Sequence, residues 1–469
     1  MDHSPARPTS PWRVLAVTGL AVFAVMLDSL VLLIAFPAIQ RSFPALSSAD
    51  LSWVLNSYTI VYGTLLVPAG SLADRLGRRR MFLVGAALFT VASLLCGLAP
   101  SVGWLIGLRA LQGVGGALLS PAALALVLAA FPLGRRTLAV AVWGAIGALA
   151  VVAGPPLGSW VVQVAGWEGI FYLNLPIGLA ALGFGRQVLA ESRNTTAQTW
   201  PDLLGAALLS LAAGLITLGL VQSEVWGWDA PATLGALIAG LLILGVFLLR
   251  SRAVANPVLD LRLFEDQTFR LANLANVLFG IVFTAMFFGW IQFLTRIWGY
   301  SLLQAGLAVT PGPLMVVLGA PLAGRLAMRW GHRNLLVAGG LLYAAGALVL
   351  LARAGATPQF LTAWLPGVML TGLGVALIVP LLSSAAVQHL PSGTLASGSG
   401  VFQALRQFAS VLGVALTVLL LGSAPERAAT FAPIFALMAA GGLCVSAISL
   451  RLPAGRSHTA ARPEVALAE

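Results

Sequence analysis

Two ionisable residues, Asp28 and Arg109, stand inside long apolar runs of the sequence. A carboxylate at membrane depth is costly unless it is protonated or paired, so Asp28 is a candidate for taking up and releasing a proton as water access alternates. Arg109 must find acceptors and would sense the charge of a nearby carboxylate. We predict that Asp28, Arg109 and Gln112 carry proton coupling. The alternatives are a structural acid bonded to a neighbouring helix and a fixed tether between helices.

A second set of polar and aromatic residues within apolar runs could line a broad, mostly apolar cavity with sparse hydrogen bonding. Its members are Trp53, Asn56, Tyr58, Asn276, Phe287, Trp290, Gln292, Gln403 and Arg406. Each of them taken singly is more often a packing residue. Arg406 could stabilise an anionic group or could hydrogen-bond to facing carbonyl groups, and the second role is favoured.

The composition indicates a membrane protein. Charged residues make up 9% of the 469 residues and hydrophobic residues 59%, whereas a soluble domain has about 25% charged residues. Such a chain cannot cover a water-facing surface, so lipid must be its solvent. The net charge of +11 is spread between apolar runs and forms no stripe that would bind nucleic acid.

The same composition argues against an enzyme and against a cofactor. Cys96 and Cys444 lie far apart within apolar runs and offer neither a disulfide framework nor a metal cluster. The chain has no lysine, so it lacks the phosphate-binding Gly-x-x-x-x-Gly-Lys motif of an ATP-driven pump. We therefore expect no enzyme, no ATP-driven pump, and no bound metal or cofactor.

Runs of about 18–25 mostly apolar residues predict transmembrane helices, and we place fourteen of them in this sequence. They lie near residues 13–36, 51–70, 81–99, 103–129, 138–162, 168–188, 203–222, 233–250, 271–294, 303–323, 334–352, 361–386, 397–421 and 431–451. The sequence thus predicts an all-α polytopic membrane protein.

Arginine placement predicts the orientation. Twenty of the 26 basic residues fall at the termini or in connections after even-numbered spans. The opposite loops contain only Arg41, Arg296, Arg353 and Arg427. Because basic residues accumulate on the cytoplasmic side, we expect a multi-pass protein of the cell (inner or plasma) membrane with both termini in the cytoplasm.

The connection at residues 70–80 places an aspartate and four arginines in a tight turn between two membrane-length runs. We predict that it forms a cytoplasmic gate through Gly70, Asp74, Arg75, Gly77 and Arg78. A degraded copy at residues 324–333 keeps two glycines seven residues apart and the basic tail, but it has a methionine in place of the aspartate. The two copies indicate two related halves of the chain, if spans seven and eight are an insertion.

A glycine- and proline-rich segment in the fifth span contains Gly147, Gly154, Pro155 and Gly158. Glycines let two helices approach closely, and a proline frees a carbonyl group and bends the helix. The segment could therefore act as a gate between helices. Glycine and proline are ordinary in membrane helices, so a pure packing role is the alternative.

These motifs resemble those of the major facilitator superfamily. Residues 70–80 are similar to its loop between the second and third spans, residues 105–116 to its fourth-span motif, and residues 154–158 to the antiporter motif of its exporters. Fourteen spans and the segment 256–264 resemble the branch of drug:proton antiporters. The resemblance implies a role for Arg109 in proton transfer and a contact of Asp74 with the start of a helix in the other half, near Ser397 and Gly398.

The resemblance also implies the architecture: two six-helix bundles with two additional central helices. The expected divisions are a cytoplasmic amino-terminal segment (1–12), an amino-terminal bundle (13–188), two linker transmembrane helices (189–250), a cytoplasmic loop (251–270), a carboxyl-terminal bundle (271–451) and a cytoplasmic tail (452–469). Its substrate site would lie near the midplane, between the halves.

We therefore expect a proton-coupled antiporter that exports lipophilic small molecules such as drugs or antibiotics. Its partners would be the substrate, protons and membrane lipid, and it would act as a monomer. Export of a dedicated lipid or natural product would suit the same cavity and is one alternative. A facilitator that has lost transport and acts as a sensor is another, although the motifs around Asp74, Arg109 and Gly154 argue against it.

Overall fold

The computed structural model describes residues 10–132, 135–193, 200–255, 257–388, 390, 395–421 and 427–453, and these residues form helices and connecting turns without a strand. The α-helices are α1 (Pro11–Ser42), α2 (Ser48–Leu76), α3 (Arg78–Gly97), α4 (Val102–Ala130), α5 (Arg136–Ala165), α6 (Glu168–Val188), α7 (Leu203–Trp226), α8 (Pro231–Ala253), α9 (Gln267–Arg296), α10 (Leu302–Val309), α11 (Pro311–Arg353), α12 (Leu365–Val387), α13 (Leu395–Leu421) and α14 (Ala432–Ser449). Three short turns of other helix types are η2 (Leu261–Glu265), η3 (Phe360–Trp364) and η4 (Ala428–Phe431).

The apolar side chains place these segments in lipid, where no water is present to form hydrogen bonds with the backbone. Each backbone N–H and C=O group must then find its hydrogen-bond partner within its own segment, and a helix provides this. The few acidic residues of the chain help to begin them. Ser47 and Asp50 form a capping box on α2, and Asp202 and Asp266 accept backbone N–H groups at the starts of α7 and α9. Such caps satisfy donors that the first turn leaves free.

Twelve helical segments in the described part of the chain are long and apolar enough to cross a membrane. One of them combines α10 with the first part of α11, and another is the last part of α11. Helix α11 is kinked at Gly331, a residue with a φ of 78°. The two remaining expected spans coincide with α2 and with α5, whose first part is only partly described. The chain is therefore a multi-pass membrane protein with twelve candidate spans, and the count of fourteen stays a prediction.

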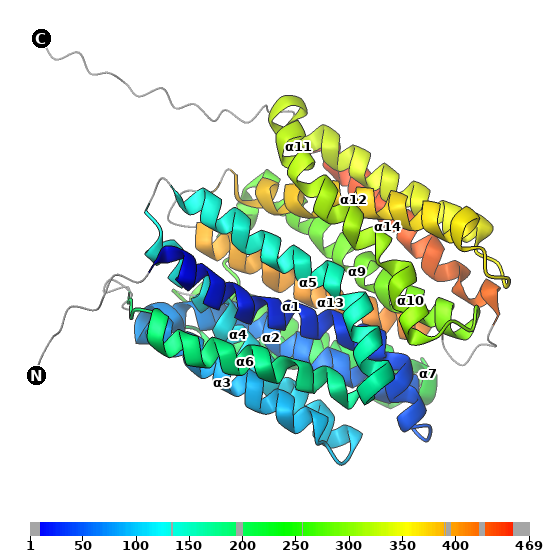
Figure 1. The fold of residues 1–469 in the computed structure, drawn as a ribbon, viewed down its shortest axis with the longest axis horizontal. Coiled ribbons are helices and arrows are strands. Elements are labelled where there is room, and N and C mark those ends of the chain that lie inside the picture. The colour runs from blue at the N-terminus through cyan, green and yellow to red at the C-terminus, as the bar shows by residue number, and fades with distance from the viewer. Residues whose placement is uncertain are drawn as a thin grey trace, which may run out of the picture.

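The helices of the two halves pack mainly within their own half (Figure 1). In the first, α1 packs against α4, α5 and α6, and α2 and α3 pack against α4. In the second, α9 packs against α12, α13 and α14, and α11 packs against α12 and α14. Contacts between the halves run mainly through α2 with α13 and α5 with α10, with smaller ones between α5 and α11 and between α1 and α9.

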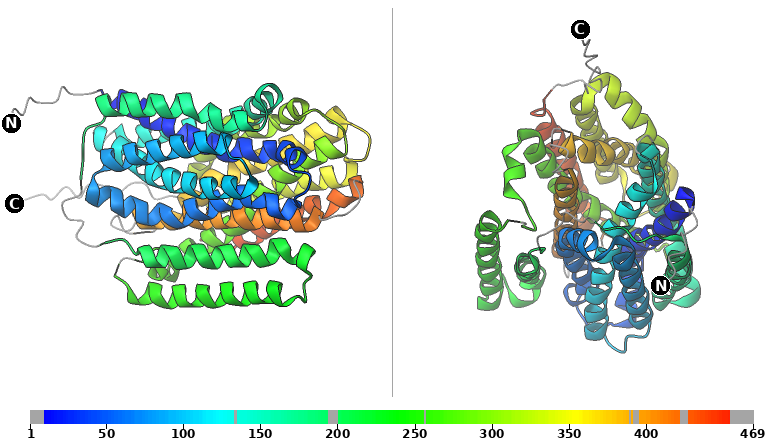
Figure 2. Two further views of the ribbon diagram at one scale, coloured as in Figure 1. Left: turned by 90° about the horizontal axis from the view of Figure 1, so that it is seen from below. Right: turned by 90° about the vertical axis from the view of Figure 1, so that its left-hand side faces the viewer.

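Helices α7 and α8 lie side by side along the outside of the other helices (Figure 2). Of the two, α7 contacts α2 and α13, and Ser210 donates a hydrogen bond of 2.7 Å to Thr64 on α2. Their position fits a linker pair, and the expected division of the chain into two bundles and a linker stays a prediction. Most of the expected terminal segments 1–12 and 452–469 lies outside the described residues.

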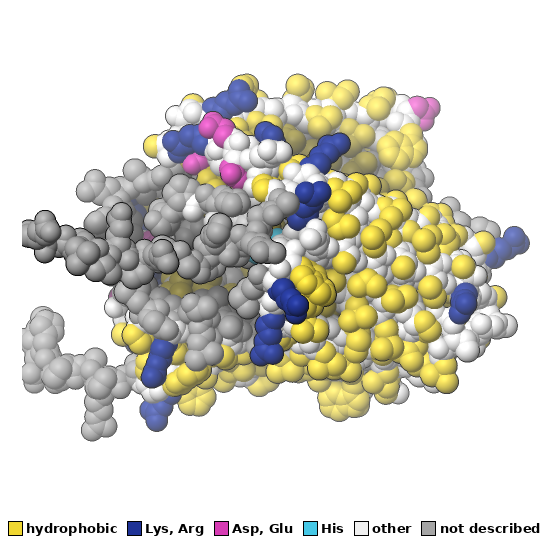
Figure 3. All heavy atoms as spheres, turned by 90° about the horizontal axis from the view of Figure 1, so that it is seen from above, with side chains coloured by type: hydrophobic (Ala, Val, Ile, Leu, Met, Phe, Trp, Pro, Cys, Tyr) yellow, Lys and Arg dark blue, Asp and Glu magenta, His cyan; other side chains and the backbone are white. Residues whose placement is uncertain are grey.

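The surface fits a lipid environment. In Figure 3 hydrophobic side chains cover a broad part of the face in view, and basic side chains lie on both sides of this area. Large exposed hydrophobic residues occur on many helices; examples are Leu149, Leu211, Leu242, Leu318 and Leu361. Exposed apolar area on this scale indicates a membrane-facing surface.

Candidate functional site

Asp28 lies on α1 and is 1% exposed. One carboxylate oxygen accepts a hydrogen bond from Arg109 at 2.6 Å, which is also an ion pair. The other oxygen accepts hydrogen bonds from Gln112 at 3.0 Å and from Asn174 at 2.8 Å. Both oxygens thus have charged or amide donors, which is the arrangement that a buried ionised carboxylate requires.

Arg109 lies on α4 and is also 1% exposed. Besides Asp28, its guanidinium donates to the Val54 carbonyl on α2 at 3.1 Å and to the Gln112 side chain at 2.7 Å. The guanidinium carbon lies 4.2 Å from the ring centroid of Tyr58, close enough for a cation–π contact. The structure therefore brings together all three predicted coupling residues, and it adds Tyr58, which the sequence had placed in the cavity.

Two residues of this site were missed in the sequence, Asn174 on α6 and Ser93 on α3. Ser93 accepts hydrogen bonds from Gln112 at 3.2 Å and Asn174 at 3.0 Å, and it donates to a carbonyl of α6. The signal that could have found both is the same as for Asp28, a polar side chain within an apolar run.

The Asp28 carboxylate is the acidic group of this network. Protonation would neutralise Asp28 and end its ion pair with Arg109, while the Val54 carbonyl and the Gln112 amide oxygen would remain as acceptors for the guanidinium. The network joins α1, α2, α3, α4 and α6. A change in the charge of Asp28 would therefore alter contacts of five helices in its half.

The predicted gate residues form a compact turn at the end of α2. Asp74 pairs with Arg78 at 2.7 Å, and the Arg75 guanidinium lies 4.0 Å from the ring centroid of Trp200. Gly77 has a φ of 115°, which favours glycine. Gly70 faces Pro121 of α4, where an added Cβ would make only ordinary contact.

Glu191, which the sequence analysis did not single out, completes this turn. Its carboxylate accepts the backbone N–H groups of Arg79 and Arg80 at 3.1 and 3.2 Å, at the start of α3. A negative charge is favourable at that helix end. The expected contact of Asp74 with the start of α13 stays a prediction, because residues 391–394 and the side chain of Ser397 lie outside the described residues.

The glycine–proline segment of α5 lies between α1 and α10. A Cβ added at Gly158 would lie 2.6 Å from Val31 on α1, and one added at Gly154 would lie 3.4 Å from Leu30. On α10, a Cβ added at Gly306 would lie 2.5 Å from the Pro155 carbonyl oxygen. At Gly147, by contrast, a Cβ would meet nothing within 4 Å. Close approach therefore explains Gly158 and the contact of the Pro155 carbonyl with Gly306, whereas Gly154 makes only ordinary contact.

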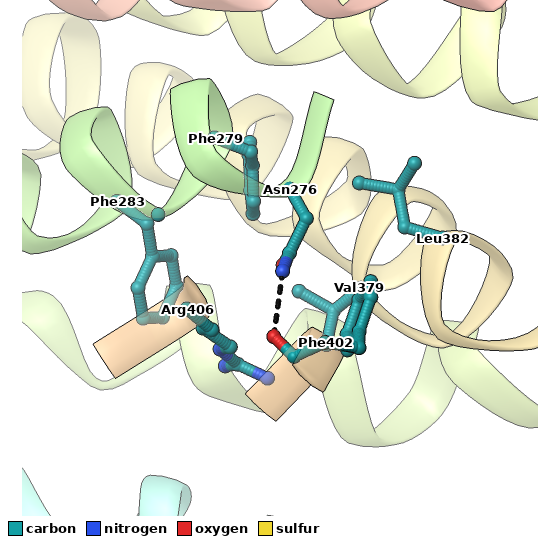
Figure 4. A pocket seen from close by; sticks show the side chains of 8 residues that line it. Asn276, Phe279, Phe283, Val379, Leu382, Phe402 and Arg406 are labelled. Atoms are coloured by element: carbon teal, nitrogen blue, oxygen red, sulfur yellow. Dashed lines mark hydrogen bonds between the residues drawn. The ribbon is translucent and has the colours of Figure 1, made fainter. Parts of the chain in front are cut away.

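Two of the predicted cavity residues, Asn276 and Arg406, line a small pocket in the carboxyl-terminal half (Figure 4). Its other lining residues are Phe279, Gly280, Phe283, Val379, Leu382 and Phe402. The pocket lies between α9, α12 and α13. Asn276 donates a hydrogen bond of 2.9 Å to the Phe402 carbonyl.

The remaining predicted cavity residues lie elsewhere. Phe287 and Trp290 are buried on α9, where Trp290 packs against Trp364 with ring centroids 5.5 Å apart. Asn56 and Gln292 are buried, and their amide oxygens have no hydrogen-bond partner within the described residues. Trp53 is half-buried and Gln403 is exposed. The structure gathers no single cavity from all nine residues, so their shared role stays a prediction.

Comparisons of the sequence with a family model and with known proteins indicate the same family. Residues 18–249, 202–414 and 272–467 match the sequence model of the Major Facilitator Superfamily. The chain is 35% identical over 426 residues to the tetracenomycin C resistance and export protein of Streptomyces glaucescens, which covers 90% of this chain and 78% of that protein. It is 35% identical over 405 residues to the multidrug resistance protein Stp of Mycobacterium tuberculosis, covering 86% and 74% of the two chains. It is also 33% identical over 457 residues to the cephamycin export protein CmcT of Amycolatopsis lactamdurans, covering 94% and 92%.

Solved structures share the fold. A bacterial homologue of the human drug peptide transporters superposes with a TM-score of 0.67 at 16% identity, covering 94% of this chain and 98% of that chain. The nucleoside transporter NupG (D323A mutant) superposes with a TM-score of 0.65 at 12% identity over the same shares. At such identities the likeness shows the fold alone.

Proposed function

The chain belongs to the Major Facilitator Superfamily. We propose that it is a proton-coupled secondary active exporter of lipophilic small molecules such as drugs or antibiotics. Export is supported by the names of relatives that are at least 33% identical over most of the chain. The proposal includes fourteen spans, a place in the cell membrane with both termini in the cytoplasm, and a monomeric protein.

The observation that carries the proton coupling is the environment of Asp28. A membrane-buried carboxylate with one arginine and two amide donors is stable when ionised, and it can lose its charge by binding one proton. The proton competes with Arg109 for the carboxylate, so each protonation changes how strongly α1 and α4 are held together. Alternating access can use such a change.

The direction of transport is proposed from the α5 segment. Gly158 lets α1 approach closely, and the Pro155 carbonyl group lies against Gly306 of the other half. A shift of α1 is therefore transmitted to a contact between the halves. The same segment resembles the antiporter motif of exporters in this family.

Export of one dedicated natural product is the second candidate function. It is favoured by two relatives whose names specify tetracenomycin C and cephamycin. A transporter for a single compound would use the same proton site. It would differ in transporting one member of a test panel rather than many.

Transport into proteoliposomes under an imposed pH gradient, with a panel of lipophilic compounds, tests the proposal. We expect gradient-driven accumulation by the wild type and no more than the protein-free background for Asp28→Asn. The matched control is Asp260→Asn, because Asp260 lies outside the spans, where the hydrogen bond from Arg262 holds the pKa of its carboxyl group below the usual value. This control should stay within about twofold of the wild type. Undiminished pH-driven transport by Asp28→Asn would reassign Asp28 to a structural role.

A further inference from the structure

Arg406 is a cation without a counter-ion in the part of the chain that the structure describes. It lies on α13 at membrane depth, and neither a hydrogen bond nor an ion pair of its side chain occurs among the described residues. The guanidinium stays charged in proteins. A charge at membrane depth is costly unless it is paired, so such a residue points to a function.

The sequence offers this arginine no acid from its own half. Between Gln267, where α9 begins, and Ser449, where α14 ends, the single acidic residue is Glu426. Glu426 follows the end of α13 at Leu421, whereas Arg406 lies in the middle of that helix. In the other half, the buried acid Asp28 already pairs with Arg109.

The surroundings of Arg406 are mostly apolar, and the pocket beside it is small. Phe279, Phe283 and Phe402 line the pocket together with Val379 and Leu382 (Figure 4). The half-buried Arg406 side chain forms part of the same wall. One fixed positive charge in an apolar wall is the arrangement that recognises a lipophilic anion, because apolar contacts supply affinity and the charge supplies specificity.

We propose that the pocket between α9, α12 and α13 binds the anionic group of a lipophilic substrate, with Arg406 as its counter-ion. The inference rests on the proposed export function and adds a substrate class, singly charged lipophilic acids. It also changes the role of Arg406 that the sequence favoured, hydrogen bonding to facing carbonyl groups, because no such bond occurs among the described residues.

The test is equilibrium binding to the purified full-length protein in nanodiscs of phosphatidylcholine, with empty nanodiscs subtracted. The probes are 1-pyrenebutanoate and its methyl ester, which share the apolar body and differ in charge. We expect the acid to bind the wild type at least about tenfold more tightly than the ester, the equivalent of one good charge interaction. Arg406→Gln should remove this preference, Arg406→Lys should keep part of it, and the exposed control Arg262→Gln should leave it unchanged.

Several results would overturn the proposal: equal binding of acid and ester, an equal loss of both in Arg406→Gln, or no saturable binding of the acid.

A further experiment adds phosphatidylglycerol to the nanodiscs. If this lipid displaces the acid from the wild type and Arg406→Gln abolishes the competition, the anion site is supported and its occupant is a lipid headgroup. Acid binding without pH-driven transport would sink the export function and leave the site intact. Transport of neutral compounds without any preference for the acid in binding would support the export function and contradict the anion site.

Discussion

Each half of the molecule has one arginine at membrane depth, and the two arginines differ in their polar partners. Arg109 has a carboxylate, an amide oxygen, a carbonyl group and an aromatic ring around it. Arg406 has none of these polar partners among the described residues, and a pocket lies beside it. The proposals for the two arginines follow from this difference: Arg109 is satisfied within the protein and belongs to the proposed proton site, whereas Arg406 is left to bind the proposed anionic ligand.

The two copies of the loop motif differ in the same sense. Both keep a glycine with positive φ, 115° at Gly77 and 78° at Gly331, so the backbone turn is common to both halves. Around the first copy, Asp74 pairs with Arg78 and Glu191 accepts N–H groups of α3. In the second copy, His332 shares a hydrogen bond of 3.1 Å with Ser384 of α12. The turn is kept, and within the described structure the acidic groups accompany the first copy.

The contrast between the two arginines predicts a large difference in the stability of their variants. Asp28→Asn leaves Arg109 as an uncompensated buried charge, so it should lower the free energy of unfolding by about 3–5 kcal/mol. Arg406→Gln removes an unpaired charge, so stability should be unchanged or increased. Thermal unfolding of the purified variants in detergent, without ligand, measures both.

A double variant separates stability from coupling in the same experiment. Asp28→Asn combined with Arg109→Gln removes both charges, so most of the lost stability should return, whereas pH-driven transport should not. If Arg406→Gln destabilises the protein as strongly as Asp28→Asn does, Arg406 has an internal partner and the contrast between the halves is wrong.

The sequence predicted the residues of the charged network better than those of the cavity, for a physical reason. A charge in an apolar run is conspicuous and must be paired, so Asp28, Arg109 and Gln112 could be proposed together before their contacts were seen. Aromatic residues in apolar runs are ordinary packing residues, and Phe287 and Trp290 lie in the buried aromatic cluster of α9 rather than in the pocket wall.

The family and the all-helical fold could likewise be predicted, because apolar length and arginine-rich turns are local features of the sequence. The role of Glu191 could not. It lies more than 110 residues from the N–H groups that it accepts, and an exposed glutamate in a connection has no distinctive sequence context. Gly331 was predicted in part. Its spacing from Gly324 indicated a repeat of the first turn, and its positive φ is the same backbone feature that Gly77 has.

A smaller effect distinguishes the two turns. Gly77→Ala must hold a positive φ, which costs about 1–2 kcal/mol, and its Cβ would lie 2.6 Å from a Glu191 carboxylate oxygen. We expect a total loss of about 2–3 kcal/mol, part of which a Glu191→Ala background should relieve. Gly331→Ala should cost the φ strain alone and be insensitive to Glu191. Thermal unfolding of the three single variants and the two double variants tests this prediction. Equal sensitivity of both glycine variants to Glu191 would contradict it.

The smallest effect concerns the charge of Glu191 at the start of α3. Glu191→Gln keeps an acceptor oxygen and removes the negative charge, so it should destabilise the protein by about 0.3–1 kcal/mol at low salt. Because the carboxylate is exposed, the loss should shrink towards zero in about 1 M salt, where the Debye length is about 3 Å. Glu265→Gln is the matched control, since Glu265 is exposed and caps no helix in the described structure. Thermal unfolding in detergent at both salt concentrations measures the difference. A loss that does not depend on salt would assign Glu191 to hydrogen-bond geometry alone, and the electrostatic contrast between the two turns would then rest on Asp74.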